Sequence, residues 1–217
     1  LYAVTARTWL HGRKLIDVVS EAIDGGAAFV QLREKSHLEG MELSGEELLA
    51  EAKKLAQLCH ERGVLFVIDD DVELALEAGA DGVHVGQSDM EALDVRAKLG
   101  PDKLIGVSAH TVEEALLAEK QGADYLGVGA VFPTSSKSDV DVMPYETLKA
   151  ICEAVSIPVV AIGGIGRENV SRLAGSGICG VAVISAIYAA KNIKSAAEEL
   201  KAAAEELKAA AEAMLRA

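Results

Sequence analysis

Short apolar segments alternate with longer amphipathic segments along the whole chain. The apolar segments are rich in Val, Ile and Leu, which is typical of strands buried in a parallel sheet. The segments between them, such as 45–63 and 111–123, have apolar residues at i, i+3, i+4 and i+7 and Gly near their ends, which predicts helices. The predicted strands are Leu1–Thr5, Phe29–Leu32, Leu65–Ile68, Gly82–Val85, Leu104–Val107, Tyr125–Gly129, Pro158–Ile162 and Gly180–Ile184. Eight strands that each lead into a helix predict a (β/α)8 barrel, the TIM-barrel class of α/β fold.

A short motif occurs four times, each time before an even-numbered predicted strand. The copies are "GGAAFVQL" (25–32), "GADGVHV" (79–85), "GADYLGV" (122–128) and "GICGVAV" (177–183). Gly at the end of a helix favours a left-handed cap, so each copy is interpreted as a helix-to-strand junction. An open doubly wound sheet is the alternative, but it normally has fewer strands and a Gly-rich fingerprint after the first one. The chain has "GRK" (12–14) there instead.

The composition predicts one domain with an aliphatic core. No linker rich in Pro, Gly or Ser divides the 217 residues, so the whole chain, 1–217, is interpreted as a single domain. Half of the residues are apolar but only 4% are aromatic, so bulky aromatic packing is not expected to build the core. The last segment, about 186–215, is rich in Ala, Glu, Lys and Leu and contains "AAEELKA" twice, which predicts a long C-terminal helix.

The charge narrows the range of binding partners, and the cysteines indicate the cellular compartment. The formal net charge is −13 and no Lys/Arg cluster is present, which argues against nucleic acid or an anionic membrane as a partner. No apolar run approaches the roughly 20 residues that a bilayer requires. Cys59, Cys152 and Cys179 have no metal-site spacing, and their odd number predicts buried thiols in a reducing compartment, so a cytoplasmic protein is expected.

Polar residues follow nearly every predicted strand, where a (β/α)8 barrel carries its chemistry. They are Gln31, Arg33, Lys35, Asp69, Asp70, Asp71, His84, Asp89, Ser108, His110, Thr134, Ser136, Lys137 and Ser185. One rim of the barrel is therefore expected to collect acids, bases and phosphate-binding groups.

Two segments near the end of the barrel predict a phosphate site. "AIGGIG" (161–166) and "VISAI" (183–187) follow the seventh and eighth predicted strands, where barrels of this class commonly bind phosphate through backbone N–H groups. The alternative is that the glycines only form tight turns. Arg33, Lys35 and Lys137 are cations on the same rim of an acidic protein, which suits a second and more highly charged phosphate group.

Asp70 and Asp89 are predicted to bind a hard cation. They follow neighbouring strands, and oxygen ligands beside a phosphate favour Mg²⁺, which typically takes one or two carboxylates together with substrate oxygens and water. The alternative for Asp70 and Asp71 is to cap the next helix. His84 lies in an apolar strand, so it is either a core histidine or a residue at the mouth of the barrel.

Six segments resemble, in order, the signature segments of the thiamin phosphate synthase family. They are "QLREK" (31–35), "DGVHVGQSD" (81–89), "GVSAH" (106–110), "GADYLGVGAVFPTSSK" (122–137), "IPVVAIGGI" (157–165) and "GVAVISAI" (180–187). The resemblance covers nearly the whole chain. It implies a (β/α)8 transferase of thiamin biosynthesis that uses Mg²⁺, joins a hydroxymethylpyrimidine diphosphate to a thiazole phosphate, and releases pyrophosphate.

The resemblance also implies roles for individual residues. Asp70 and Asp89 match the Mg²⁺ ligands, while His84 and Asp69 match positions near the pyrimidine ring. The positions that match contacts to the diphosphate are Gln31, Arg33, Lys35, Ser108 and Lys137. The positions that match the thiazole phosphate site are Thr134, Ser136, Gly164, Ile184 and Ser185. The implied mechanism is loss of pyrophosphate to a pyrimidine methyl cation, which the thiazole nitrogen captures.

Two other functions fit part of the pattern. A thiazole tautomerase on the same scaffold would need the phosphate site but neither the metal carboxylates nor the diphosphate cations, so their presence favours the synthase. A non-catalytic phosphate-binding barrel is suggested by the repetitive C-terminal segment and by a departure at 69–71. The family commonly has Asn, Asp and Arg there, whereas this chain has three Asp residues. Association into a homo-oligomer is left open.

Overall fold

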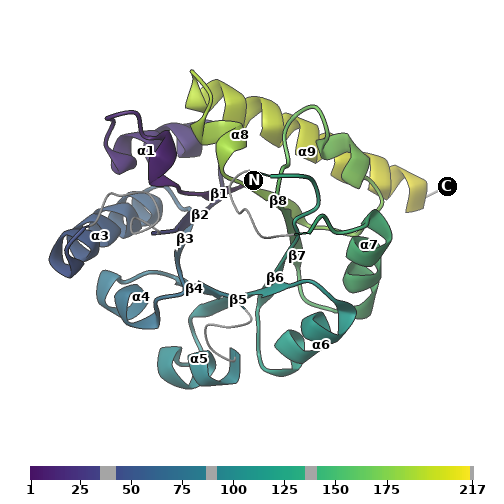
Figure 1. Ribbon diagram of the computed structural model, residues 1–217, viewed down its shortest axis with the longest axis horizontal. Helices are drawn as coiled ribbons and strands as arrows, with labels where there is room; N and C mark the ends of the chain where they lie inside the picture. Colours follow the sequence, from purple (N-terminus) through teal and green to yellow (C-terminus); the bar gives the residue numbers. More distant parts are fainter. Residues whose placement is uncertain (35–42, 87–91, 135–140, 216–217) are drawn as a thin grey trace.

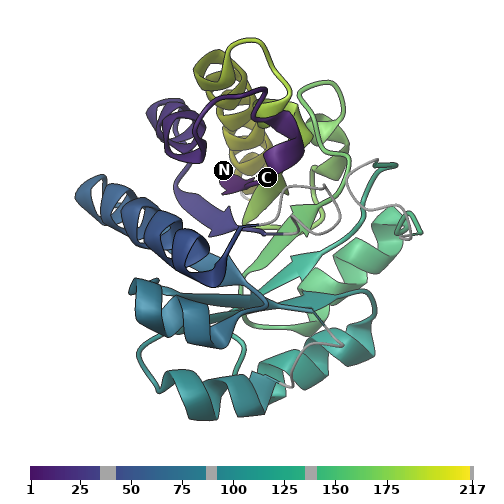
Figure 2. The same ribbon diagram turned by 60° about the vertical axis from the view of Figure 1, so that its left-hand side comes forward.

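The strands form a closed barrel in which each pairs in parallel with its neighbours in chain order and β8 pairs with β1. The computed structural model describes residues 1–34, 43–86, 92–134 and 141–215 (Figures 1 and 2). The strands are β1 Tyr2–Val4, β2 Phe29–Leu32, β3 Leu65–Asp69, β4 Gly82–Val85, β5 Leu104–Ala109, β6 Tyr125–Val128, β7 Val159–Ile162 and β8 Gly180–Val183. The predicted fold class is confirmed. β2 and β4 have the predicted bounds, and the other six strands differ from the predicted ones by one or two residues at an end.

Helices surround the barrel, as Figure 1 shows in the view along its axis. In the described part of the chain the α-helices are α1 Leu15–Asp24, α3 Gly45–Glu61, α4 Val72–Ala78, α5 Ala92–Leu99, α6 Val112–Lys120, α7 Tyr145–Ala154, α8 Ser185–Tyr188 and α9 Ile193–Leu215. Short 3-10 helices lie at η1 Arg7–Trp9 and η2 Val170–Leu173. The helix predicted from 45 begins at a capping box, in which Ser44 Oγ accepts the N–H of Glu47 and the Glu47 carboxylate accepts the N–H of Ser44.

Each copy of the repeated motif contains a glycine with a positive φ angle before an even-numbered strand. Gly26, Gly79, Gly122 and Gly177 have φ angles of 96°, 73°, 95° and 93°, which lie in the region that favours glycine. An even-numbered strand begins a few residues after each of these glycines. The predicted left-handed glycine at the end of a helix is confirmed for Gly26, Gly79 and Gly122, which follow α1, α4 and α6. Gly177 has a positive φ but lies beyond the 3-10 helix η2 and its C-cap Ala174, so the fourth copy does not end a helix.

The C-terminal segment differs from the single helix predicted over about 186–215. It forms two helices, α8 Ser185–Tyr188 and α9 Ile193–Leu215. The break follows from local capping, because Asn192 Oδ1 accepts the N–H of Ser195 at 2.9 Å and starts a new helix at this point. In α9, Ala197 and Leu200 are buried against the core.

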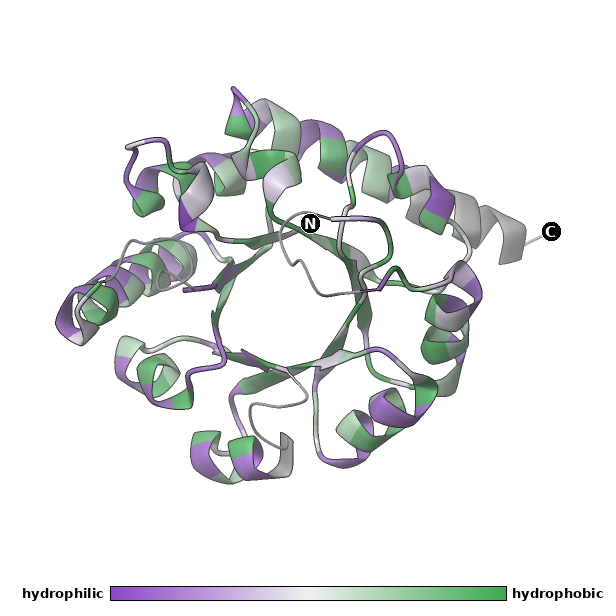
Figure 3. Ribbon diagram, in the orientation of Figure 1, coloured by the Kyte–Doolittle hydropathy of each residue, from purple (hydrophilic) through white to green (hydrophobic). Residues whose placement is uncertain are grey.

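The core has an aliphatic layer outside the barrel and a partly aromatic centre inside it. The main core packs Val, Leu, Ile and Ala side chains between the strands and the helices, and Figure 3 shows hydrophobic residues along the strands with hydrophilic ones on the outer faces of the helices. Inside the barrel, Tyr2 stacks on Phe29 with ring centroids 4.3 Å apart, and Tyr125 lies edge-on to Tyr2. The expectation that aromatic packing does not build the core is therefore wrong for the barrel interior. Three of the eight Phe, Tyr and Trp residues, namely Tyr2, Phe29 and Tyr125, pack there.

Two further expectations concern the cysteines and the membrane. All three cysteines are free thiols, but only Cys59 is buried, whereas Cys152 is partly buried and Cys179 is exposed. The expectation of three buried thiols is thus wrong for Cys179, because Cys179 lies at the surface just before β8.

Among the residues that the structure describes, no helix combines the length and the apolar character needed to cross a bilayer.

Candidate active site

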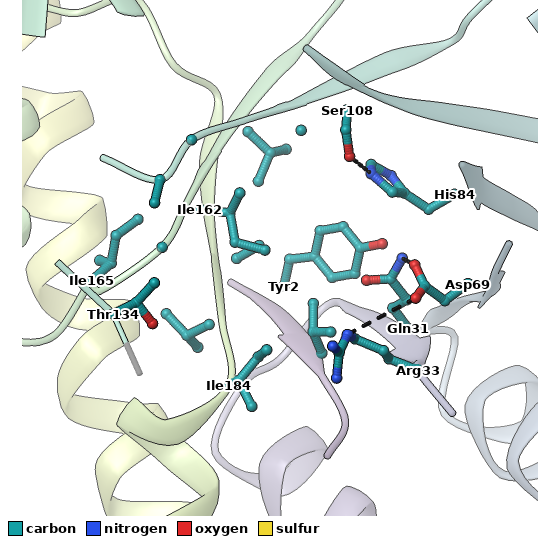
Figure 4. Close-up of a pocket in the computed structure, with 18 of the residues that line it drawn as sticks. Tyr2, Gln31, Arg33, Asp69, His84, Ser108, Thr134, Ile162, Ile165 and Ile184 are labelled. Carbon is teal, nitrogen blue, oxygen red and sulfur yellow. Dashed lines mark hydrogen bonds and ion pairs between the residues drawn. The ribbon is translucent and has the colours of Figure 1, made fainter. Parts of the chain in front are cut away.

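A cavity of about 360 Å³ opens at the carboxyl ends of the strands (Figure 4). One side of it is polar and carries Gln31, Arg33, Asp69, His84 and Ser108, as the close-up shows. The opposite side is formed by apolar side chains of β7 and β8 and by the loops that follow β6 and β7; its labelled residues are Thr134, Ile162, Ile165 and Ile184. The cavity therefore offers two chemically different ends to its ligands.

The polar side is organised around Asp69, the last residue of β3. Gln31 Nε2 donates to Asp69 Oδ1 at 3.0 Å, and Arg33 Nε lies 4.0 Å from Asp69 Oδ2. Gln31 and Arg33 alternate along the same strand end, so both side chains point into the barrel. The Arg33 backbone N–H also donates to Thr5 Oγ1 at 3.0 Å, which fixes the end of β2 against β1.

Arg7 braces the segment that carries Arg33. It is 9% exposed, and its Nε donates to Glu34 Oε2 at 2.5 Å while its Nη2 donates to Glu51 of α3. A charge this deeply buried is stable only when it is paired and hydrogen-bonded. The ion triad therefore ties the loop after β1, the exit of β2 and helix α3 together beside the cavity.

His84 belongs to a hydrogen-bonded chain that crosses the barrel. His84 Nε2 lies 3.1 Å from Ser108 Oγ, His84 Nδ1 lies 3.1 Å from Tyr125 Oη, and Tyr125 Oη lies 3.1 Å from Tyr2 Oη. Burial raises the pKa of Tyr125 and of Tyr2, so both phenols keep their protons at neutral pH. His84 is interpreted from the sequence either as a core histidine or as a residue at the mouth of the barrel. The structure favours the second interpretation, because His84 and Ser108 both line the cavity.

Two glycines make room for this chain of side chains. A Cβ at Gly127 would lie 2.8 Å from His84 Cε1, and a Cβ at Gly106 would overlap the Tyr125 ring and His84 Nδ1. Glycine inside a strand usually marks such a close approach. The pattern of glycines in β5 and β6 is therefore explained by the aromatic ring and the imidazole that pack over them.

The opposite end of the cavity is formed by the glycine loop after β7. Gly163 and Gly164 have φ angles of 98° and 63°, and a Cβ at Gly164 would lie 2.7 Å from the Phe132 carbonyl oxygen. The loop after β6 pairs with this turn, since Phe132 N–H donates to the Gly163 carbonyl at 3.0 Å. Ile184 and Ser185, after β8, complete the wall. A bare backbone beside a cavity is the form that a phosphate site of this fold takes.

Asn169 holds the glycine loop in shape. Its Nδ2 donates to the Gly164 carbonyl at 2.8 Å, and its Oδ1 accepts the Gly166 N–H at 2.9 Å. The side chain does not line the cavity, so it acts on a ligand only through the loop.

If this end binds the predicted phosphate, replacing Asn169 by Ala is expected to raise KM for that ligand about 30-fold, because two hydrogen bonds of roughly 1 kcal/mol each are lost. Asn169→Asp keeps the acceptor for Gly166 but not the donor to Gly164, so we expect an intermediate KM. Steady-state kinetics on the two variants measures both values. Equal KM values in Asn169→Ala and in the unchanged protein would show that the loop keeps its shape without this side chain.

Asp70 lies at the rim of the cavity in an unusual backbone conformation. Its φ angle is 61°, its N–H donates to the His84 carbonyl at 2.8 Å, and its Oδ1 accepts the Gly86 N–H at 3.4 Å. Non-glycine residues in this region are uncommon and are concentrated at functional sites. Asp71 has a different role, since its Oδ1 accepts the Leu74 N–H at 2.8 Å and caps α4. Of the two candidate uses of these neighbours, capping thus applies to Asp71.

The carboxylate of Asp70 fits a magnesium ion. Within the described ranges, no three His, Cys, Asp or Glu side chains gather into a metal-binding group. Magnesium in phosphate sites typically uses only one or two carboxylates together with substrate oxygens, so Asp70 at the cavity rim matches this requirement.

The structure places most of the predicted site residues in this one cavity. Those that line it are Gln31, Arg33, Asp69, Asp70, His84, Ser108, Thr134, Gly164, Ile184 and Ser185. Lys35, Asp89, Ser136 and Lys137 lie outside the described residues. The roles of all these residues remain predictions.

Sequence reasoning missed Tyr2, Tyr125 and Asn169. The two tyrosines could have been found from strand alternation, because Tyr125 shares the inward face with Gly127, and Tyr2 shares it with Val4. Asn169 carried no signal of its own, since Asn is common in loops for many reasons.

The fold and the site together define a (β/α)8 barrel with a cavity at the carboxyl ends of its strands. Comparisons with known proteins give the family. The family model described as thiamine monophosphate synthase matches residues 1–187. The chain therefore belongs to the thiamine monophosphate synthase family.

Individual relatives agree with this assignment. The chain is 48% identical over 196 residues to a thiamine-phosphate synthase of Clostridium tetani. This match covers 90% of this chain and 91% of that protein. It is 50% identical over 186 residues to a thiamine-phosphate synthase of Geobacillus kaustophilus, with 85% and 82% covered. Among solved structures, a thiamine phosphate pyrophosphorylase from Pyrococcus furiosus matches with a TM-score of 0.85 and 41% identity over 95% of both chains.

Proposed function

We propose that the protein is a Mg²⁺-dependent transferase that joins 4-amino-2-methyl-5-(hydroxymethyl)pyrimidine diphosphate to a thiazole phosphate, giving thiamin phosphate and pyrophosphate. The observation that carries the proposal is the two-ended cavity. It has cationic and carboxylate groups on one side and a glycine loop on the other. Relatives that share nearly half of the sequence over most of the chain are thiamine-phosphate synthases, which supports the same reaction here.

The polar side suits the pyrimidine diphosphate. Gln31, Asp69 and His84 offer donors and acceptors to a planar heterocycle, and Asp69 as a carboxylate accepts from an exocyclic amine. Arg33 and Ser108 are placed to donate to diphosphate oxygens, with Lys35 and Lys137 as predicted further cations. Asp70, with Asp89 as its predicted partner, would hold Mg²⁺, which when bound offsets negative charge on the leaving group.

The glycine-loop side suits the thiazole phosphate. Backbone N–H groups near Gly164, together with Thr134 and Ser185, would hold the phosphate, with Ser136 as a further predicted contact. Ile162 and Ile184 form an apolar wall that keeps water from competing with the thiazole nitrogen for the reactive methylene carbon. The chain supplies no nucleophile in this scheme. Its residues bind and orient both rings and stabilise charge on the departing diphosphate.

One assay tests the proposal. Purified protein is mixed with both substrates in the presence of Mg²⁺ or of EDTA, and thiamin phosphate is measured. We expect product with Mg²⁺ and little with EDTA. Absence of product with Mg²⁺ would refute the synthase, and equal rates in EDTA would refute the metal dependence. A thiazole tautomerase would isomerise the thiazole substrate alone, without the pyrimidine.

A further inference from the structure

The direction of the hydrogen bonds through Tyr2, Tyr125, His84 and Ser108 can be inferred from the donors and acceptors that each group has. Each phenol carries one hydrogen to donate, and each oxygen can also accept. The ring nitrogens of a neutral imidazole are one donor and one acceptor. Fixing the direction at one end therefore fixes it along the whole chain.

Tyr2 is the end that sets the direction. It is 5% exposed, and among the residues that the structure describes its Oη has one hydrogen-bond partner, Tyr125 Oη, at 3.1 Å. If Tyr2 only accepted, the hydrogen of this buried phenol would have no acceptor among the described residues, which is costly. Tyr2 therefore donates to Tyr125. Burial and this hydrogen bond both raise the pKa of Tyr2, which is the effect expected for a donor.

The remaining steps follow from the valence of each group. Tyr125 accepts from Tyr2, so its hydrogen goes to its other partner, His84 Nδ1. His84 Nδ1 must then be an acceptor, and the imidazole hydrogen must lie on Nε2, which is 3.1 Å from Ser108 Oγ. The Ser108 hydroxyl accepts from His84 and must direct its own hydrogen away from the imidazole.

We propose that Tyr125 is a positioning residue that holds His84 in its Nε2–H tautomer, so that the Ser108 hydroxyl presents its hydrogen to an oxygen of the ligand's diphosphate. The inference rests on the proposed function for the identity of the ligand. The tautomer itself is a property of the ligand-free protein. Gly106 and Gly127 are needed for the same arrangement of side chains, because a Cβ at either position would displace the imidazole or the phenol.

The full-length protein, labelled with ¹⁵N at histidine, tests the tautomer directly. The ¹⁵N chemical shifts of a histidine ring distinguish a protonated nitrogen from an unprotonated one, and His84→Gln identifies the signals of His84 among those of the other histidines. We expect an unprotonated Nδ1 and a protonated Nε2. A protonated Nδ1 in the unchanged protein would overturn the proposal whatever the variants do.

Variants test the link to catalysis. Tyr125→Phe keeps the ring that packs on Phe29 but removes the donor to His84, so we expect the fixed tautomer to be lost and kcat to fall about tenfold, with a smaller change in KM. Tyr2→Phe leaves Tyr125 donating to His84, so the tautomer should persist. Tyr188→Phe is the matched control, because Tyr188 is a buried phenol whose hydroxyl has no hydrogen-bond partner among the described residues. It should change neither quantity.

The outcomes separate this proposal from the proposed function. If the unchanged protein forms thiamin phosphate but Tyr125→Phe keeps both the tautomer and kcat, the positioning role is wrong and the synthase stands. If the spectra show the Nε2–H tautomer but no thiamin phosphate forms, the proposed function is wrong, and with it the role of Ser108 toward the diphosphate.

Discussion

Replacing Asp70 by Asn is expected to lower kcat about 100- to 1,000-fold, the loss typical of removing one group that stabilises charge in a transition state. Under the proposed function, this carboxylate at the cavity rim would hold Mg²⁺ against the leaving diphosphate. Binding of the thiazole phosphate, measured by calorimetry, should be nearly unchanged, because Gly164 and Ser185 lie at the other end of the cavity. The measurement is a steady-state assay of thiamin phosphate at saturating Mg²⁺.

The choice of Asn separates charge from backbone strain. Asp70 has a φ angle of 61°, which Asn tolerates and Ala does not, so Asp70→Asn removes the charge with little change in conformation. Asp71→Asn is the matched control. It removes the adjacent charge, and Asn can still cap α4 by accepting the Leu74 N–H. Similar losses in both variants would assign the effect to net charge, and loss of thiazole phosphate binding in Asp70→Asn would contradict the two separate ends.

Replacing Gly164 by Ala is expected to weaken binding of the thiazole phosphate about 100-fold, the scale of effect that a displacement near 1 Å has at a reacting site. The new Cβ would lie 2.7 Å from the Phe132 carbonyl oxygen and even closer to that of Pro133. These are backbone atoms, so the loop itself must move. Calorimetry with the thiazole phosphate alone measures the affinity.

Gly63→Ala provides the control for this second variant. Gly63 has a φ angle of 66°, close to the 63° of Gly164, but a Cβ there would have no neighbour within 4 Å. Both variants are expected to lose about 1–2 kcal/mol of folding stability, because alanine disfavours this backbone conformation. Only Gly164→Ala should lose affinity. Equal affinity in the two variants would show that the glycine loop does not bind the phosphate.

The barrel could be predicted from the sequence because its strands are buried on both sides. Runs such as Phe29–Leu32 and Val159–Ile162 are apolar at nearly every position, and glycines such as Gly79 and Gly122 mark where each even-numbered strand begins. The gathering of polar residues on one rim could be predicted from the same pattern, since the residues that follow parallel strands lie at one end of the barrel.

The hydrogen-bonded chain inside the barrel could not be predicted in the same way. Tyr2 and Tyr125 are 123 positions apart in sequence and meet across the barrel, so no local pattern relates them. The break between α8 and α9 was missed for a different reason. The Ala-rich composition favours helix throughout, and a single capping interaction at Asn192 decides where the second helix starts.

A crystal structure with Mg²⁺, thiamin phosphate and pyrophosphate bound is the most direct test of the two-ended cavity. We expect pyrophosphate beside Arg33 and Ser108, Mg²⁺ between it and Asp70, and the phosphate of thiamin phosphate on the glycine loop at Gly164. The pyrimidine ring should lie near Asp69 and His84. Electron density for pyrophosphate on the glycine loop, or for thiamin phosphate outside this cavity, would contradict the account.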